Sequence, residues 1–177
     1  MILETERLIL NLLDECDELD IVRWRNKKEI IDSFFSYRGV TISNHRSWFE
    51  SYSKDNTRLE YVISIKSTKS KIGTIGLSGI DHKNQKAEYG IMIAEESARS
   101  QGFAQEASIA IINYAFAELN LRKIKLNVFA DNADAIKLYN KLRFQEEGIL
   151  RQEIFKNSSY KDVIMMALFK KAWLNDA

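Results

Sequence analysis

The hydrophobic pattern of this chain changes period at Ile93, and this change constrains the fold more than any other feature of the sequence. Three strand-like segments precede it, at residues 60–65, 71–77 and 87–93, and polar stretches of turn composition separate them. After a polar loop, residues 102–119 are apolar on most faces, which is typical of a helix buried against a sheet. The pattern therefore predicts an antiparallel meander followed by a strand–loop–helix unit.

The rest of the chain supplies further periodic segments that fit the same sheet. Period-two alternation predicts strands, and apolar residues three and four apart predict helices. We expect Ser43 to cap the second of the helices. The segments are a strand at 7–12, helices at 14–26 and 43–54, a strand at 123–129, a helix at 132–142, and strands at 145–155 and 163–169. The predicted fold class is α/β (α+β), with a mixed, mainly antiparallel sheet of six to seven strands flanked by about four helices.

Composition predicts one globular domain over residues 1–177. Hydrophobic residues make up 45% of the 177-residue chain, and the sequence has no proline, so no proline-rich linker divides it. The 26 basic residues nearly balance the 25 acidic ones, so no global field draws the chain onto nucleic acid or an anionic membrane. Any polyanion has to be bound by a local site.

The cysteine and histidine content indicates the redox compartment of the protein and whether a metal site is expected. Cys16 is the single cysteine and cannot form an internal disulfide, and with His45 and His82 it makes no metal-ligand cluster. We therefore expect a cytoplasmic setting and no metal. The first residues carry acids where an export signal needs bases, so no signal peptide is expected. The most apolar window, 107–117, is shorter than the about 20 residues that a membrane crossing needs.

The stretch at residues 99–104, Arg-Ser-Gln-Gly-Phe-Ala, lies directly between a predicted strand and a predicted helix. A loop of small residues there exposes backbone N–H groups at the positive end of the helix dipole, which is a site for phosphate. Gly102 lets the backbone approach a ligand closely, and Arg99 adds a cation. Such a turn also occurs for purely structural reasons, so both interpretations stay open. The glycine patterns of Walker A and Rossmann sites are absent.

Two segments together resemble one protein family. The loop at 99–104 is similar to the Q/R-x-x-G-x-G/A acetyl-coenzyme A (acetyl-CoA) loop of the GNAT superfamily of N-acetyltransferases, and residues 132–144 are similar to its N-x-x-A-x-x-x-Y-x-K-x-G-F segment. The opening residues 3–10, and the closing residues 147–151 with 160–162, resemble the branch that contains the ribosomal-protein alanine acetyltransferases. More loosely, Trp24-Arg25-Asn26 with His45, Trp48 and Phe49 resembles the enzymes that N-acetylate a nucleotide-linked 4-amino sugar in pseudaminic acid synthesis.

The resemblance implies that acetyl-CoA is the acetyl donor. It also implies that strand 87–93 is the splayed strand whose backbone N–H groups hold the pantetheine and polarise the thioester carbonyl. Asn132 is expected to cap its helix as well as to contact the coenzyme. The residues implied for coenzyme binding are Ile91, Met92, Ile93, Arg99, Ser100, Gln101, Gly102, Phe103, Ala104, Asn127, Asn132, Tyr139 and Lys141.

The resemblance further implies direct attack by the substrate amine, with Tyr139 as the general acid for the departing thiolate. A phenol with a reference pKa near 10 is protonated at neutral pH and can fill this role. Glu88 is the candidate general base, since alternation places it on one strand face with Gly90 and Met92. A surface carboxylate without a catalytic role is the alternative, and an amine of low pKa needs no base.

The resemblance also implies that the first third of the chain recognises the acceptor, and the candidate residues there are mostly aromatic. Aromatic residues at helical spacing also form cores, so this assignment competes with a packing role. His45 is in addition a second candidate base. The candidates are Trp24, Arg25, Asn26, Phe34, Phe35, His45 and Trp48.

One residue departs from the family pattern. Arg143 stands where the family has the glycine that ends the helix with a positive φ. Arg143 either accepts that backbone geometry at a cost of roughly 1 kcal/mol, or the helix ends differently. Its charge could also lie near the phosphates of the coenzyme.

The sequence therefore predicts an acetyl-CoA-dependent N-acetyltransferase acting on a primary amine. The preferred acceptor is the 4-amino group of a nucleotide-linked amino sugar, followed by the N-terminus of a ribosomal or other protein and by a polyamine. The near-neutral charge argues mildly against a polyamine, although a local acidic cluster would escape that count. An acyl-CoA-sensing module without turnover is the non-enzyme alternative. We expect a small-molecule partner, no nucleic acid and no membrane, with a homodimer open as an assembly.

Overall fold

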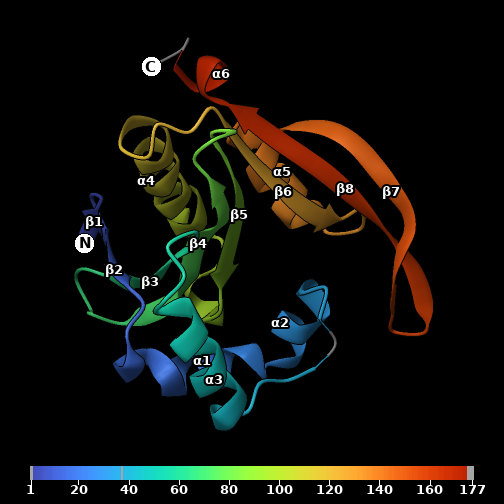
Figure 1. Ribbon diagram of the computed structural model, residues 1–177. Helices are drawn as coiled ribbons and strands as arrows, with labels where there is room; N and C mark the ends of the chain where they lie inside the picture. The colour runs from blue at the N-terminus through green and yellow to red at the C-terminus, as the bar shows by residue number, and fades with distance from the viewer. Residues whose placement is uncertain (1, 37, 175–177) are drawn as a thin grey trace.

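Eight strands form one sheet in the computed structural model, which describes residues 2–36 and 38–174 (Figure 1). The strand order is β1-β2-β3-β4-β5-β6-β8-β7, and all neighbours are antiparallel except β5 and β6. The predicted fold class is confirmed, with a larger sheet than the six to seven strands expected because the three-residue β1 is too short to show alternation. The strands are β1 (Ile2–Glu4), β2 (Leu8–Leu12), β3 (Leu59–Ile65), β4 (Lys71–Asp81), β5 (Lys86–Ile93), β6 (Lys123–Phe129), β7 (Gln145–Lys156) and β8 (Ser159–Phe169).

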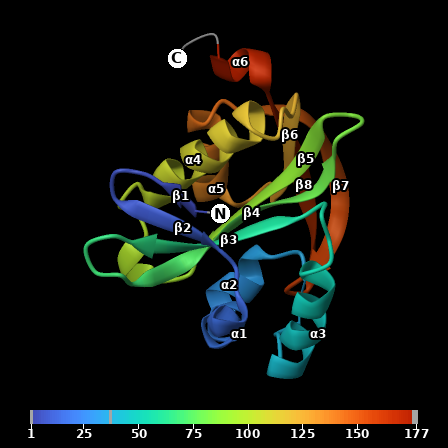
Figure 2. The ribbon, with the colours of Figure 1, turned by 60° about the vertical axis from the view of Figure 1, so that its left-hand side comes forward.

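The described residues contain six α-helices, against the about four expected. Two of them, α2 and α6, have only 6 and 5 residues, too few for a helical period to be visible in the sequence. Figures 1 and 2 show α1, α2 and α3 gathered together, apart from α4 and α5. None of the described helices has the length and apolar character that crossing a membrane requires. The helices are α1 (Glu18–Arg25), α2 (Lys28–Ser33), α3 (Ile42–Tyr52), α4 (Phe103–Ala117), α5 (Ala133–Lys141) and α6 (Lys170–Leu174).

Local capping corrects two of the expected helix starts. The helix expected from residue 14 opens as a 3-10 turn over Glu15–Asp17, capped by Asp14, and becomes α-helical at Glu18. Helix α3 is capped by Thr41 and not by Ser43, because the Thr41 hydroxyl oxygen accepts the Asn44 N–H at 3.1 Å. Thr41 has the extended backbone that an N-cap needs, whereas Ser43 already lies inside the first turn.

Two apolar clusters cover the two faces of the sheet. The larger cluster packs α4 and α5 against strand residues such as Tyr61 and Tyr89. The smaller cluster joins Trp24 of α1 to Val62 of β3 and Met92 of β5. Burying a large apolar side chain contributes about 1.5–3 kcal/mol, so the fully buried Trp24 fixes α1 firmly on its face of the sheet.

Strands β5 and β6 separate soon after they meet. Their parallel pairing covers only Lys86–Glu88 opposite Lys123–Lys125 among the described residues, although β5 continues to Ile93 and β6 to Phe129. Helix α4 connects the two strands and packs on the sheet in the larger cluster. The separation leaves backbone groups of β5 without a partner on β6 and opens the sheet at this point.

The long hairpin of β7 and β8 is tied to α2 near its tip. The Lys156 ammonium donates to the backbone carbonyl oxygens of Ile31, Phe34 and Ser36, at 3.0 Å for Ser36. Burial lowers the pKa of Lys156 below its ordinary value, and the three carbonyls take the place of water around it. This contact holds the end of α2, and the phenylalanines that follow it, beside the open part of the sheet.

Candidate active site

A cavity of about 970 Å³ opens where β5 and β6 separate. The residues that line it come from both halves of the chain: from α1, α2 and α3, from the start of β3 and the middle of β4, from β5 and β6, and from α4 and α5. One end lies at the loop that precedes α4, and the other lies among the first three helices. Such a cavity at a break in a sheet is the usual place for a small-molecule site.

The loop at the α4 end has the geometry of an anion site. Ser100 and Gly102 both have positive φ, 60° and 82°, and Gly102 is the N-cap of α4. In the described part of the chain, no side chain caps this helix end. The first N–H groups of α4 therefore stay available to a ligand at the positive end of the helix dipole, and residues 102–105 line the cavity.

Two arginines hold this loop in place. Arg99 donates from Nε to the carbonyl of Ile93 at 3.2 Å and lies 3.5 Å from a carboxylate oxygen of Glu29 on α2. Arg7 forms an ion pair with Glu106 of α4 at 2.6 Å and donates to the Gln101 carbonyl at 3.0 Å. Arg7 was not among the site residues expected from sequence, although it lies in the opening segment that resembles the family.

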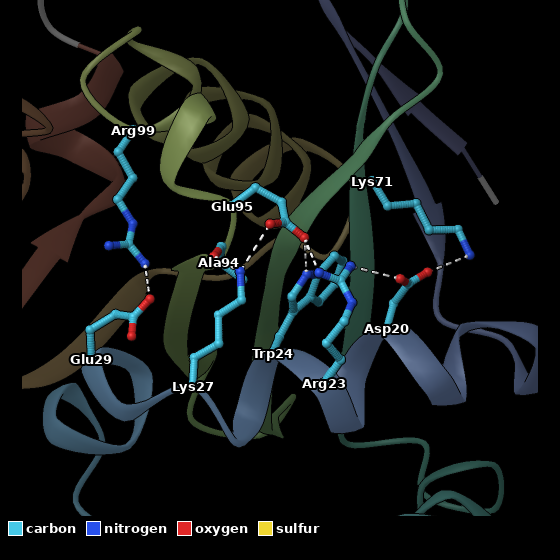
Figure 3. Close-up of polar contacts among 9 residues, drawn as sticks. All are labelled: Asp20, Arg23, Trp24, Lys27, Glu29, Lys71, Ala94, Glu95 and Arg99. Atoms are coloured by element: carbon cyan, nitrogen blue, oxygen red, sulfur yellow. Dashed lines mark hydrogen bonds and ion pairs between the residues drawn. The ribbon is translucent and has the colours of Figure 1, made fainter.

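Glu95 ties the start of this loop to α1 (Figure 3). Its carboxylate accepts the Trp24 indole N–H at 2.6 Å and pairs with Lys27 at 2.9 Å and Arg23 at 2.7 Å. These donors, the indole first, lower the pKa of Glu95 to about 2. The network joins α1 to the chain segment that leads from β5 to the anion site.

We expect Glu95→Gln to lower the free energy of unfolding at pH 7 by about 2 kcal/mol, because a lowered native pKa stabilises the fold wherever the carboxyl is ionised. The glutamine amide oxygen can still accept one hydrogen bond from Trp24. The expected loss in the free energy of unfolding is therefore smaller than the roughly 3 kcal/mol to which the full pKa shift corresponds. The contribution is present above the ordinary value of 4.5 and is lost as the pH falls towards about 2. Urea unfolding at pH 7 and pH 3 measures it, with the exposed Glu96→Gln as control. Equal losses at both pH values would contradict the ion-pair explanation.

Tyr139 of α5 projects from the core into the cavity. Its ring packs edge-on against Tyr89 at 6.1 Å and against Phe144 at 5.9 Å, and its side chain is buried while still lining the cavity. Burial raises the pKa of Tyr139 to about 12. The phenol is therefore protonated at neutral pH and is placed to donate a hydrogen bond or a proton.

Helix α5 begins and ends as its sequence indicates. Asn132 caps it by accepting the Ala135 N–H at 3.2 Å, which confirms the expected cap. Arg143 accepts the left-handed backbone with φ 68°, so the helix ends in the family's manner without the glycine. Its guanidinium donates to the Ala172 carbonyl of the C-terminal segment at 3.4 Å and is not part of the cavity lining.

Successive side chains of β5 lie on opposite faces of the sheet, as the sequence predicts. Tyr89, Ile91 and Ile93 pack in the larger cluster, and Met92 packs in the smaller one. Glu88 therefore lies on the same face as Gly90 and Met92 and lines the cavity. Its carboxylate is half-exposed and lies 3.3 Å from the ammonium of Lys125.

A second carboxylate on this face, Glu60 of β3, was missed by sequence reasoning. It lines the cavity, and burial raises its pKa from 4.5 to about 7 although Arg58 and Arg25 oppose the shift. The signal available in the sequence was an acid at the start of an otherwise apolar strand, which is also common at strand ends on a protein surface. Only the helices packed over this face remove it from water.

The expected acceptor residues separate into two groups. Arg25, Phe34, Phe35 and Trp48 line the cavity, and the Arg25 guanidinium lies 4.0 Å from the ring centre of Phe34. The other three do not line it: Trp24 is bonded to Glu95, Asn26 bonds to the backbone of Val22 and Val40, and His45 is buried between Trp48 and Phe49 with its pKa lowered by burial. The structure therefore places Trp24, Asn26 and His45 outside the cavity lining, in packing and loop-closing contacts, and their role in acceptor binding stays a prediction.

The residues expected to bind the coenzyme converge on the cavity with one exception. Gln101 does not line it and instead donates from its side chain to the Ser97 carbonyl. The free N–H groups at α4 suit phosphates, and the unpaired edge of β5 suits an extended amide chain, so the site fits coenzyme A. Among residues 2–36 and 38–174, no three His, Cys, Asp or Glu residues are grouped as for a metal ion. The lining residues are Ile91, Met92, Ile93, Arg99, Ser100, Gly102, Phe103, Ala104, Asn127, Asn132, Tyr139 and Lys141.

Comparison with known proteins identifies the family of this chain. The family model described as "Acetyltransferase (GNAT) domain" matches residues 7–145. A spermidine N(1)-acetyltransferase of Vibrio cholerae is 31% identical over 96% of this chain and 96% of its own length. The crystal structure of spermidine N-acetyltransferase from Vibrio cholerae in complex with CoA and spermine has a TM-score of 0.91 at 29% identity, covering 97% of this chain and 100% of that one. A dodecameric structure of that enzyme has a TM-score of 0.84 at 29% identity, covering 97% and 98%.

A sheet that opens between two strands, an uncapped helix start that suits an anion and a buried tyrosine are the features expected of an acyl-CoA-dependent acyltransferase. The chain belongs to the GNAT acetyltransferase family and is an acetyl-CoA-dependent N-acetyltransferase. These relatives are spermidine acetyltransferases and do not single out the ribosomal-protein or amino-sugar branch expected from the sequence.

Proposed function

We propose that this enzyme acetylates a primary amine of a polyamine. The observation that carries the proposal is the charge of the acceptor end of the cavity, where Glu29 of α2, Glu60 of β3 and Glu88 of β5 share one lining. These carboxylates come from three elements and have cations beside them, since Glu29 pairs with Arg99 and Glu88 with Lys125. Spaced carboxylates suit an acceptor with several separated ammonium groups. The spermidine acetyltransferases among the relatives support the same class.

In the proposed reaction, acetyl-CoA supplies an acetyl thioester to the attacking amine. The N–H groups at the start of α4 bind the phosphates, and the free edge of β5 orients the thioester beside the acceptor. Tyr139 donates its phenol proton to the departing sulfur. Asn132 and Lys141 flank the same channel from α5 and contribute to coenzyme binding.

A nucleotide-linked amino sugar remains the second candidate because of one residue. Arg25 brings a cation into the acceptor end, where it stacks on Phe34, and such a pair suits a phosphate or a nucleobase better than a polycation. Phe35 and Trp48 add aromatic surface for a ring. The two candidates therefore differ in the charge of the acceptor that they require.

We expect a panel of amines at fixed acetyl-CoA to give the highest kcat/KM with spermidine or spermine, measured as release of the coenzyme thiol and as product mass. Because the attraction is ionic, kcat/KM for these amines falls as salt rises. The other arms are a nucleotide-linked 4-amino sugar and a peptide with an N-terminal alanine. Preference for either would replace the polyamine. Binding of acetyl-CoA with no product from any amine would instead support a sensing module.

We also propose that the enzyme is a multimer in the cytoplasm. The dodecameric structure of the Vibrio cholerae enzyme supports an assembly larger than the homodimer considered from the sequence. Cys16, the single cysteine, is exposed and agrees with a reducing compartment.

A further inference from the structure

We infer that Glu60 is the general base that takes a proton from the acceptor ammonium, with the amine bound over Gly90 of β5. The inference rests on the proposed function, since it requires a basic amine as acceptor. It moves the role expected for Glu88 to a residue on a different strand, two strands away from β5.

The sheet register places Glu60 in one row with two glycines. Glu60 of β3 is opposite Gly76 of β4, and Gly76 is opposite Gly90 of β5. Neighbouring strands are spaced by about 5 Å, so the row spans roughly 10 Å across the face that carries the cavity. All three residues line that cavity.

The glycines leave a shallow channel across the sheet into which the Glu60 side chain extends. A Cβ added at Gly76 would overlap the Glu60 carboxylate, so this carboxylate lies directly over Gly76. A Cβ added at Gly90 would meet no described atom within 4 Å, so the place next to the carboxylate is open. That place lies beside the part of β5 that has left β6, where the thioester is expected. An amine there contacts the carboxylate on one side and the acetyl carbonyl on the other.

The surroundings of Glu60 suit a base more than those of Glu88 do. Glu88 is half-exposed and already paired with Lys125. Glu60 is largely removed from water, and its raised pKa of about 7 matches a group that exchanges protons near neutral pH. Tyr52 bonds to its backbone and fixes the strand, at 3.3 Å to the N–H and 3.4 Å to the carbonyl. The charged groups that act on its carboxyl are Arg25 from α1 and Arg58 beside its own strand, and Tyr52 from α3 bonds to its backbone. The charged and titratable groups that share its cavity are Arg25, Glu29, Glu88, Tyr89, Arg99, Asp134, Lys137, Tyr139 and Lys141.

The proton balance of the step is complete without another reactant. One proton passes from the acceptor ammonium to the Glu60 carboxylate, and the neutral amine then forms the C–N bond while the C–S bond breaks. Tyr139 gives its proton to the sulfur, and the second proton leaving the nitrogen restores the phenol. Glu60 finally releases its proton to solvent, so the products are the amide, the thiol and one proton.

The test compares pH profiles of kcat/KM for spermidine. In the wild type, we expect kcat/KM to rise and level off above a pH of about 7, as Glu60 becomes ionised. Glu60→Gln lowers kcat/KM at pH 7 by about 10²- to 10⁴-fold. Because only amine that is already neutral can then react, the variant keeps rising with pH, and its deficit shrinks by about tenfold per pH unit. Glu88→Gln should keep the plateau of the wild-type pH profile, whether or not its kcat/KM is lower. Glu50→Gln, at an exposed position of α3, is the matched control.

Two further experiments distinguish the loss of proton transfer from a structural effect of the substitution. An aminooxy analogue of the acceptor is neutral at pH 7 and needs no base, so Glu60→Gln should lose no more than roughly threefold with it. Glu60→Asp keeps a carboxylate that can titrate but withdraws it from its place over Gly76, and should lower kcat/KM for spermidine while keeping a plateau in the pH profile, even if Glu60→Gln does not fold. An unchanged profile in Glu60→Gln, or an equal loss with both acceptors, would overturn the inference. If wild-type enzyme acetylated no amine, the proposed function would fail instead.

Discussion

Replacing Tyr139 with phenylalanine lowers kcat by about 10²- to 10⁴-fold, because the ring remains and only the proton donor to the departing thiolate is lost. The ring keeps its packing against Tyr89 and Phe144, so the fold and the coenzyme affinity should be unchanged. A loss confined to the transition state appears in kcat and not in the dissociation constant of acetyl-CoA. Steady-state kinetics and the thermal shift produced by acetyl-CoA measure the two quantities separately.

Tyr61→Phe is the matched control for this experiment. Tyr61 is fully buried, is not part of the cavity lining, and has a hydroxyl without a hydrogen-bond partner among the described residues. Removing that hydroxyl should leave kcat unchanged and stability equal or higher. If Tyr139→Phe retained more than roughly half of the wild-type kcat, on a scale where a lost acid is worth several kcal/mol, Tyr139 would be a packing residue.

Gly102→Val should weaken acetyl-CoA binding by about 10- to 100-fold, because losing one hydrogen bond to a charged group costs roughly 1.5–3 kcal/mol. The side chain would stand where the first N–H groups of α4 meet the phosphates. It would also approach the Arg7 guanidinium, whose Nη2 lies 3.4 Å from an added Cβ. Calorimetric titration with acetyl-CoA and the KM for acetyl-CoA measure the loss.

The backbone at Gly102 requires a control, since φ is 82° and any side chain there is strained by roughly 1–2 kcal/mol. Gly79→Val supplies it: Gly79 also has positive φ, 55°, an added Cβ meets no described atom within 4 Å, and the residue does not line the cavity. Both variants should lose similar stability, but Gly79→Val should keep its affinity for acetyl-CoA. Equal affinities in the two variants would exclude a phosphate site at Gly102.

The coenzyme half of the site could be predicted from sequence because it is built from near neighbours. Gly102 forms the turn before α4. Asn132 caps α5 by accepting the N–H of Ala135, three residues further along the chain. Each of these interactions joins residues within one turn of helix, so a short motif contains all of its geometry. At Arg143 the motif left two helix ends open, and the structure shows the left-handed backbone.

The residues at the acceptor end of the cavity could not be predicted in the same way. Trp24, His45 and Trp48 all lie in predicted helices, yet only Trp48 lines the cavity, because the Trp24 indole bonds to Glu95, which is distant in the chain, and His45 is buried in α3. The raised pKa of Glu60 is likewise not visible in its own strand, because it arises when α1, α2 and α3 cover this face of the sheet.

By itself, the amino-acid sequence determined the longer elements, the cap of α5 and the turn before α4, because these depend on contacts a few residues apart, and its resemblance to a family indicated the class of reaction. Only the tertiary structure decided which carboxylates line the cavity and which aromatic side chains form core. Burial, and with it the cost of ionising Glu60, depends on what packs against a residue from far along the chain. A row such as Glu60, Gly76 and Gly90 exists only once three strands are in register.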